Sequence, residues 1–149
     1  MEMILLIGIQ ATGKSEFCKC NFYKTHMRIN LDMLRTRHRE QLFLDACIKA
    51  KQPFVVDNTN PTRKDRERYI KAAKEAGFTV KGYYFKSGIK ESIARNERRL
   101  GKECIPVQAL LCTHSKLELP NLDEGFDALY YVRIGSDGEF IVEDFCDEI

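Results

Sequence analysis

Residues 8–15 constrain the fold of this chain more than any other stretch. They spell Gly-Ile-Gln-Ala-Thr-Gly-Lys-Ser, which fits the phosphate-binding loop (P-loop) pattern G-x-x-x-x-G-K-[ST] at every defined position. A short apolar run, Met3–Ile7, comes before the loop and predicts a buried parallel strand, and a helix is expected after Ser15. Strand, glycine-rich turn and helix form the setting in which this pattern binds phosphate. The alternative, an ordinary glycine turn, is disfavoured because Lys14 and Ser15 stand in register.

The residue types in the loop indicate what it binds. Gly8 and Gly13 let the backbone curl until successive N–H groups face one point at a helix N-terminus, where they attract an anion. Lys14 can reach the terminal phosphates of a nucleotide, and the Ser15 hydroxyl can ligate Mg²⁺. The nucleotide-binding residues predicted in the loop are Gly8, Gln10, Ala11, Thr12, Gly13, Lys14 and Ser15. The sequence therefore predicts a protein that binds a nucleoside triphosphate.

Length and composition predict one globular domain over residues 1–149. The chain is 44% hydrophobic and 31% charged, which is typical of a folded protein rather than a disordered one. It contains no apolar run near the roughly 20 residues that cross a bilayer, and its first residues lack the features of a signal peptide. A cytoplasmic protein without membrane contact is expected. The six cysteines form no C-x-x-C pair, so reduced thiols are expected and a zinc site is not.

The net charge of +2 hides a strong asymmetry along the sequence. Residues 1–102 contain 22 Lys and Arg against 11 Asp and Glu, whereas residues 103–149 contain 2 against 11. The basic part includes the P-loop, so its field favours a polyanionic ligand. The acidic end of the chain is expected to keep the fold soluble or to cover a basic surface.

Strands and helices alternate along the chain. Strands are predicted at residues 3–7, 27–30, 54–57, 78–85, 128–134 and 139–142. Helices are predicted after Ser15 and at residues 32–51, 61–76, 89–100 and 106–117, with Asn60 as the N-cap of the third. Such alternation after a P-loop predicts an α/β fold with a parallel sheet covered by helices on both faces.

Two clusters of polar residues follow predicted strands. Asp32 and Arg35 are three apart at a helix start, where Asp32 could accept a proton from an attacking hydroxyl and Arg35 could grip an acceptor phosphate. They could equally be a helix-start residue and its ion-pair partner. Asp57 follows the third strand and could hold Mg²⁺ or its water shell, or could simply form an Asx turn.

A third cluster lies in the predicted helix at 89–100. Arg95 and Arg99 are four residues apart, which suits a pair of cations that clamp a triphosphate from a closing lid. The alternative is a basic helix face exposed to solvent.

Together these motifs resemble polynucleotide 5′-hydroxyl kinases, both the phage-type enzymes and the kinase domains of end-repair enzymes. The resemblance rests on the P-loop, on Asn30-x-Asp32-x-x-Arg35, on Asp57-Asn58-Thr59-Asn60-Pro61 and on Arg95-Asn96-x-x-Arg99. It extends more weakly through residues 105–107 and 124–126, and so covers essentially the whole chain. Many members of that family carry a phosphatase or ligase domain for which this chain has no room, so only the kinase step is expected of it.

The resemblance implies an adenylate-kinase-like P-loop fold with strand order 2-3-1-4-5 and a helical lid at about residues 88–118. It implies transfer of the γ-phosphoryl group of ATP, with Mg²⁺, to the 5′-OH of DNA or RNA. The implied catalytic residues are Asp32 as general base, Lys14, Arg35 on the acceptor phosphate, and Arg99. Arg95 and Arg99 would bind ATP, and Ser15 and Asp57 would hold the metal.

Two other functions stay open from the sequence. One is a P-loop kinase for a small molecule or an aminoacyl-tRNA, which would share the P-loop, the base and the lid arginines. It would lack the basic surface that we expect from the arginines and lysine at positions 35, 37, 39, 63, 64, 66 and 68. The other is a non-catalytic nucleotide-binding switch or partner protein, which the complete set of candidate catalytic residues disfavours.

Overall fold

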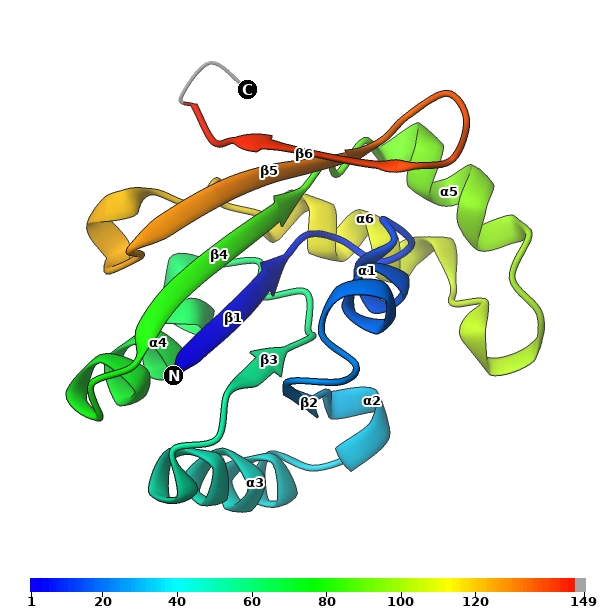
Figure 1. Ribbon diagram of the computed structural model, residues 1–149. Helices are drawn as coiled ribbons and strands as arrows, with labels where there is room; N and C mark the ends of the chain where they lie inside the picture. The colour runs from blue at the N-terminus through cyan, green and yellow to red at the C-terminus, as the bar shows by residue number, and fades with distance from the viewer. Residues whose placement is uncertain (147–149) are drawn as a thin grey trace.

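A six-stranded sheet forms the centre of the computed structural model, which describes residues 1–146 except the side chain of residue 102 (Figure 1). The strands are β1 (Glu2–Ile7), β2 (Met27–Ile29), β3 (Phe54–Val56), β4 (Thr79–Phe85), β5 (Ala128–Ile134) and β6 (Phe140–Asp144). Their order is β2-β3-β1-β4-β5-β6, and every neighbouring pair is parallel except β5 and β6. The predicted order 2-3-1-4-5 is confirmed, and the last predicted strand, at 139–142, forms β6, an antiparallel strand at the edge of the sheet.

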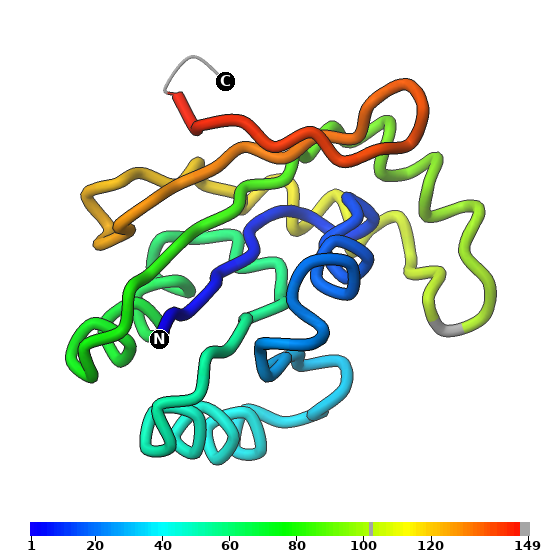
Figure 2. Tube along the Cα trace, in the orientation of Figure 1, coloured from blue at the N-terminus to red at the C-terminus, as the bar shows by residue number. Residues whose placement is uncertain are grey.

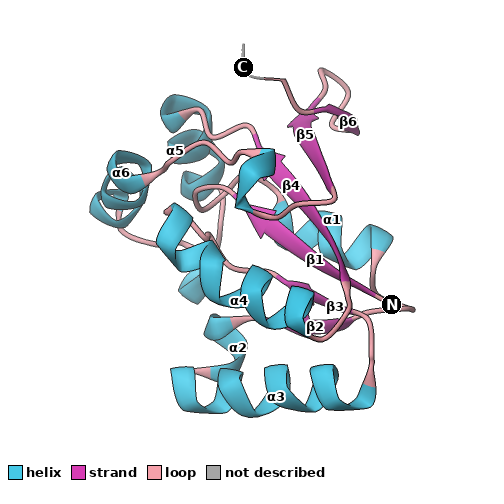
Figure 3. Ribbon diagram, turned by 90° about the vertical axis from the view of Figure 1, so that its left-hand side faces the viewer, coloured by secondary structure: helices cyan, strands magenta, loops and turns pink. Residues whose placement is uncertain are grey.

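Helices cover both faces of this sheet, as predicted (Figure 3). On one face α1 (Lys14–Asn21) buries Phe17 and Cys18 against Ile4 and Leu6 of β1. On the other face lie α3 (Arg37–Ala50) and α4 (Arg63–Glu75), whose buried side chains include Leu44 and Tyr69. Because β1 contributes to both apolar clusters, its sequence is a continuous apolar run rather than an alternating one.

The remaining helices gather at the carboxyl end of the strands. They are α2 (Leu31–Leu34), α5 (Ile89–Glu97) and α6 (Val107–Lys116), with the short 3₁₀ turn η1 (Gly101–Glu103). A second 3₁₀ turn, η2 (Leu122–Glu124), lies beside α4 and leads into β5. The trace in Figure 2 shows α5, η1 and α6 as one excursion that projects beyond the sheet beside the P-loop. This excursion corresponds to the segment in which the sequence predicts a lid.

Three predicted element boundaries are wrong. The helix predicted at 32–51 is broken at Arg35, which has a positive φ of 77°, and α3 starts anew after Thr36, whose side chain accepts a hydrogen bond from the Arg39 N–H. The N-cap of α4 is Thr62 rather than Asn60, since Thr62 and Asp65 form a capping box. The helix predicted at 89–100 ends at Glu97, so Arg99 lies beyond it.

Two further predictions concern membrane contact and the extent of the domain. None of the helices within residues 1–146 has the length and apolarity needed to cross a membrane. The final residues of the predicted domain, Asp147, Glu148 and Ile149, lie outside the described residues.

Candidate active site

The P-loop connects β1 to α1 through an unusual backbone. Gly8 and Gly13 have φ values of 155° and 92°, and Ala11 is also left-handed at 61°. Position 13 does not accept a larger residue without rearrangement, because a Cβ there would lie 2.9 Å from the Phe140 ring of β6. The Gly8 N–H donates to the Thr59 carbonyl oxygen at 3.0 Å and the Thr12 hydroxyl donates to the Ile9 carbonyl oxygen at 3.0 Å. These contacts hold the curl that the motif predicts for an anion nest.

Lys14 is buried at the start of α1 and points back into the loop. Its Nζ donates to the Ile9 carbonyl oxygen at 2.6 Å. Burial lowers the pKa of the Lys14 ammonium to about 8; the Asp57 charge raises it, Arg99 lowers it and Asp32 raises it. Asp57, Arg99 and Asp32 line the same cleft as Lys14.

Ser15 and Asp57 meet beside Lys14. The Ser15 hydroxyl donates to Asp57 Oδ2 at 3.0 Å, and Asp57 is buried. A serine hydroxyl oxygen beside a carboxylate oxygen is a ligand set that suits Mg²⁺. The predicted metal ligands are therefore brought together by β3 and the first turn of α1.

A cleft of about 380 Å³ opens at this end of the sheet. Seven predicted site residues line it: Gln10, Ala11, Lys14, Ser15, Asp32, Asp57 and Arg99. The opposite wall comes from Ile105, Pro106 and Ala109, at the start of α6. The cleft thus brings the predicted phosphate, metal and base residues around one volume.

Asp32 and Arg35 do not share a helix face, contrary to the spacing argument. Asp32 lies in the short helix α2 and lines the cleft, whereas Arg35 is the residue after the helix and is not part of the lining. Both side chains are exposed. The predicted alternative, an Asp32–Arg35 ion pair, does not occur among the described residues.

The two lid arginines approach the P-loop from separate positions. Arg95 in α5 donates from Nη1 to the Ala11 carbonyl oxygen at 3.3 Å, and Arg99 lines the cleft from the loop after α5. Buried Asn96 closes that loop, because its Nδ2 donates to the Ile105 carbonyl oxygen at 2.6 Å and its Oδ1 accepts from the Ile105 N–H at 2.9 Å. A further contact joins the P-loop to α6, where Gln10 Nε2 donates to Thr113 Oγ1 at 2.9 Å.

Asn30 and Asn58 hold α2 in place, a role that the sequence analysis did not assign to these motif residues. Asn30 caps α2 by accepting from the Met33 N–H, and it donates to the Asp57 carbonyl oxygen at 2.6 Å. The side chain of Asn58 accepts from the Leu31 N–H at 2.9 Å and donates to buried Glu40 at 3.1 Å. The signal available was the run of asparagines that follows β2 and β3, since such residues cap helices and loops.

Arg28 is a residue that sequence reasoning missed. Its Nε donates to Asp57 Oδ2 at 2.9 Å and its Nη2 donates to Ser15 Oγ at 3.3 Å. Arg28 is the middle residue of a three-residue strand, where a charged side chain is uncommon, and that position was the signal in the sequence.

The expected basic surface is smaller than the sequence predicts. Arg66 is fully buried and makes a bidentate pair with Glu124, with Nε–Oε1 and Nη2–Oε2 distances of 2.8 and 3.1 Å. Arg37 and Arg68 both pair with Glu40, and Arg63 pairs with Asp123 at 2.8 Å. Arg37 and Glu40 are three apart on α3, a spacing that the sequence does contain. The other three pairs could not be predicted from periodicity and charge, because the acidic partners of Arg63, Arg66 and Arg68 lie on other elements.

A sequence family described as an AAA domain matches residues 3–118, from β1 to just beyond α6. The bifunctional polynucleotide phosphatase/kinase of Schizosaccharomyces pombe (strain 972 / ATCC 24843) is 26% identical to the chain over 131 residues. That match covers 84% of this chain and 32% of the relative, so the chain spans about a third of the relative's length.

Solved structures share the fold at low identity. A gluconokinase from Sinorhizobium meliloti 1021 superimposes with a TM-score of 0.63 at 18% identity, covering 91% of this chain and 83% of that one. Kti12 from Chaetomium thermophilum in complex with ADP-AlF3 gives a TM-score of 0.65 at 16% identity, covering 91% and 92%. These likenesses show that the fold is that of P-loop kinases and carry no information on the acceptor.

Proposed function

The chain belongs to the AAA domain family of P-loop proteins, and we propose that it is a polynucleotide 5′-hydroxyl kinase that transfers the γ-phosphoryl group of ATP to a nucleic acid 5′-OH. One observation carries the proposal: Lys14, Ser15, Asp32 and Arg99 line a single cleft, so the donor phosphate and a proton acceptor can share it. The S. pombe polynucleotide phosphatase/kinase supports the choice of acceptor.

The proposed donor site is the P-loop. Its N–H groups at Gln10, Ala11, Thr12 and Gly13, together with the Lys14 ammonium, hold the phosphates of ATP. Gly8 contributes the turn that starts the loop, since its own N–H is bonded to Thr59. Arg95 and Arg99 add positive charge from the lid. A bound phosphate oxygen would give the Lys14 ammonium the anionic partner that its burial demands, and this keeps it protonated.

Ser15 and Asp57 are the proposed metal ligands. A magnesium ion held there would neutralise negative charge on the β- and γ-phosphates. The protein's role is to offer two oxygen ligands close together. Ser15 Oγ and Asp57 Oδ2 meet this need, since they lie 3.0 Å apart.

Asp32 is the proposed general base. The 5′-hydroxyl oxygen attacks the γ-phosphorus while the bond from that phosphorus to the β–γ bridging oxygen breaks, and Asp32 takes the hydroxyl proton. ADP leaves with the bridging oxygen. Arg35 is exposed beside α2 and is proposed to contact a phosphate of the acceptor strand outside the cleft.

The first prediction tests both the acceptor and the base. Incubation with γ-labelled ATP and Mg²⁺ should label a 5′-OH oligonucleotide, and Asp32→Asn should lower the single-turnover rate by about 10²–10⁴-fold with ATP affinity unchanged. Asp45→Asn, on the exposed side of α3, is the matched control and should transfer phosphate normally.

Other outcomes of the same assay separate the alternatives. Nucleosides, sugars, uncharged tRNA and aminoacyl-tRNA are offered as parallel acceptors. Labelling of one of these instead of the oligonucleotide would identify a different kinase, and ATP binding without labelling of any acceptor would indicate a nucleotide-binding switch. If Asp32→Asn transfers phosphate at the wild-type rate, Asp32 is not the base and has only a structural role in the first turn of α2.

A further inference from the structure

Arg28 contacts both proposed metal ligands, yet the proposed reaction gives it no role. Its neighbour in β2, Ile29, packs into the apolar cluster under α3 and α4, so Arg28 points to the opposite face, toward α1. There its guanidinium lies 2.9 Å from Asp57 Oδ2 and 3.3 Å from Ser15 Oγ. The Arg28 side chain is 37% exposed, whereas Asp57 is 2% exposed. Arg28 is therefore the solvent-exposed partner of a buried carboxylate.

Arg28 and a magnesium ion would compete for the lone pairs of Ser15 Oγ and Asp57 Oδ2. The Ser15 hydroxyl uses its single proton in the bond to Asp57 Oδ2, so Arg28 Nη2 takes one of its lone pairs. A magnesium ion binds such oxygens at about 2.0–2.1 Å. A guanidinium and a divalent cation cannot both approach Ser15 Oγ and Asp57 Oδ2 that closely without strong repulsion.

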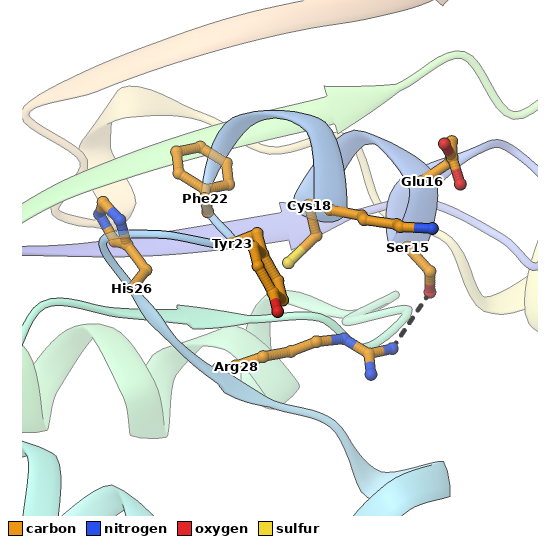
Figure 4. Close-up of a pocket in the computed structure, with 8 residues that line it drawn as sticks. Ser15, Glu16, Cys18, Phe22, Tyr23, His26 and Arg28 are labelled. Atoms are coloured by element: carbon orange, nitrogen blue, oxygen red, sulfur yellow. Dashed lines mark hydrogen bonds between the residues drawn. The ribbon is translucent and has the colours of Figure 1, made fainter.

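A groove beside α1 has space for a second position of the Arg28 guanidinium. The groove has a volume of about 530 Å³ and extends from Ser15 past Tyr23 to His26. Figure 4 shows Arg28 lying along it below the Tyr23 ring, with the guanidinium at the Ser15 end. Tyr23 is exposed, and its ring lies above the Arg28 side chain (Figure 4), so it offers a face on which the guanidinium can stack. A displaced guanidinium would therefore find a new partner.

We propose that Arg28 competes with the metal: its guanidinium and a nucleotide-bound magnesium ion cannot occupy the site at Ser15 Oγ and Asp57 Oδ2 together. Metal binding requires the Arg28 guanidinium to move away from Ser15, along the groove in which the rest of the side chain already lies (Figure 4). Arg28 thereby sets the Mg²⁺ concentration at which the chain binds ATP tightly. This inference rests on the proposed function, since it needs an Mg²⁺–ATP site.

Equilibrium binding of ATP at a series of Mg²⁺ concentrations, without an acceptor, tests this competition. The measured quantity is the Mg²⁺ concentration that gives half of the gain in ATP affinity. In Arg28→Gln it should be roughly tenfold lower than in the wild type, which is the size expected for one lost bond to a charged group. Lys19→Gln is the matched control, because Lys19 lines the same groove and loses the same charge without touching Asp57.

Arg28→Lys guards against a folding defect in the glutamine variant. It keeps a positive charge for Asp57 but loses the two-pronged geometry, so its Mg²⁺ requirement should fall between those of the wild type and Arg28→Gln. An Mg²⁺ requirement that is unchanged or higher in both Arg28 variants overturns the inference and leaves the kinase proposal intact. Failure of the wild type to bind ATP at any Mg²⁺ concentration overturns both.

Discussion

At the scale of single residues, Lys14 places a functional charge where folding disfavours it. Its ammonium is buried, and the pKa is lowered to about 8. Lys14→Met should abolish transfer, because the charge on the moving phosphoryl group loses its partner. At pH 7 the free energy of unfolding of this variant should exceed that of the wild type by up to about 3 kcal/mol, since burial of the ammonium no longer opposes folding. Chemical denaturation of both proteins measures this difference.

The pH dependence provides the control for this prediction. Between pH 8 and the ordinary lysine value of 10.5, the folded wild type binds fewer protons at Lys14 than the unfolded chain does. Wild-type stability therefore rises with pH across that window relative to Lys14→Met, and the advantage of the variant should shrink. The Ile9 carbonyl oxygen keeps a donor in the variant, because the Thr12 hydroxyl also bonds to it. A less stable Lys14→Met at pH 7 would contradict the argument.

The sequence predicted some site residues one by one and missed others for a physical reason. Lys14 and Ser15 are set by a local motif whose spacing determines backbone geometry. The ion pair between Arg28 and Asp57 joins residues 29 apart, and it exists only because β2 and β3 lie side by side. A local sequence pattern predicts the P-loop residues. The pair between Arg28 and Asp57 can be recognised only once the order of the strands in the sheet is known.

At the scale of elements, a single side chain holds the loop that carries Arg99. Asn96 makes two hydrogen bonds to the backbone of Ile105. Asn96→Ala leaves both backbone groups without these partners, so the free energy of unfolding should fall by about 1–3 kcal/mol. Arg99 should lose its fixed position over the cleft, so ATP should bind more weakly, in the same direction as for Arg99→Ala. Thermal melting and ATP titration measure the two effects.

Ser92 offers a matched control on the same helix. It is also fully buried in α5, but its hydroxyl has no hydrogen-bond partner among the described residues. Ser92→Ala should therefore keep ATP affinity and lose no stability. Full ATP affinity in Asn96→Ala, alongside weak binding in Arg99→Ala, would show that Asn96 does not position the arginine.

The boundaries of elements were harder to predict than their types. Strands at 54–57 and 128–134 follow from apolar, β-branched runs and agree closely with β3 and β5. The break at Arg35 was missed because residues 32–51 contain no glycine or proline. Only the Thr36 cap marks the start of α3, and a threonine within a helical pattern is a weak signal on its own.

At the scale of the whole molecule, the charge asymmetry of the sequence is largely used inside the fold. Acidic residues of the second part pair with basic residues of α4: Asp123 with Arg63, Glu124 with Arg66 and Asp127 with Lys74. Residues 123–127 therefore neutralise part of a basic helix. The role predicted for the acidic tail at 142–149 stays a prediction: its Glu143 pairs with Arg133 of β5, and residues 147–149 lie outside the described residues. Neutralised cations of this kind contribute little to binding a polyanion.

The cations that remain available give the last prediction. Arg35 and Arg39 are exposed on either side of the Thr36 cap, and neither has an ion-pair partner in residues 1–146. If each contacts one phosphate of a single-stranded acceptor, the plot of log affinity against log salt should flatten by about 0.7 per arginine removed. The double variant Arg35→Ala/Arg39→Ala should therefore show a slope that is smaller by about 1.4, measured by fluorescence anisotropy of a labelled oligonucleotide. The matched control is Arg63→Ala/Arg68→Ala, whose arginines already pair with acidic groups of the chain and whose loss should leave the slope nearly unchanged. Equal slopes for both double variants and the wild type would mean that the acceptor strand does not cross the α2–α3 junction.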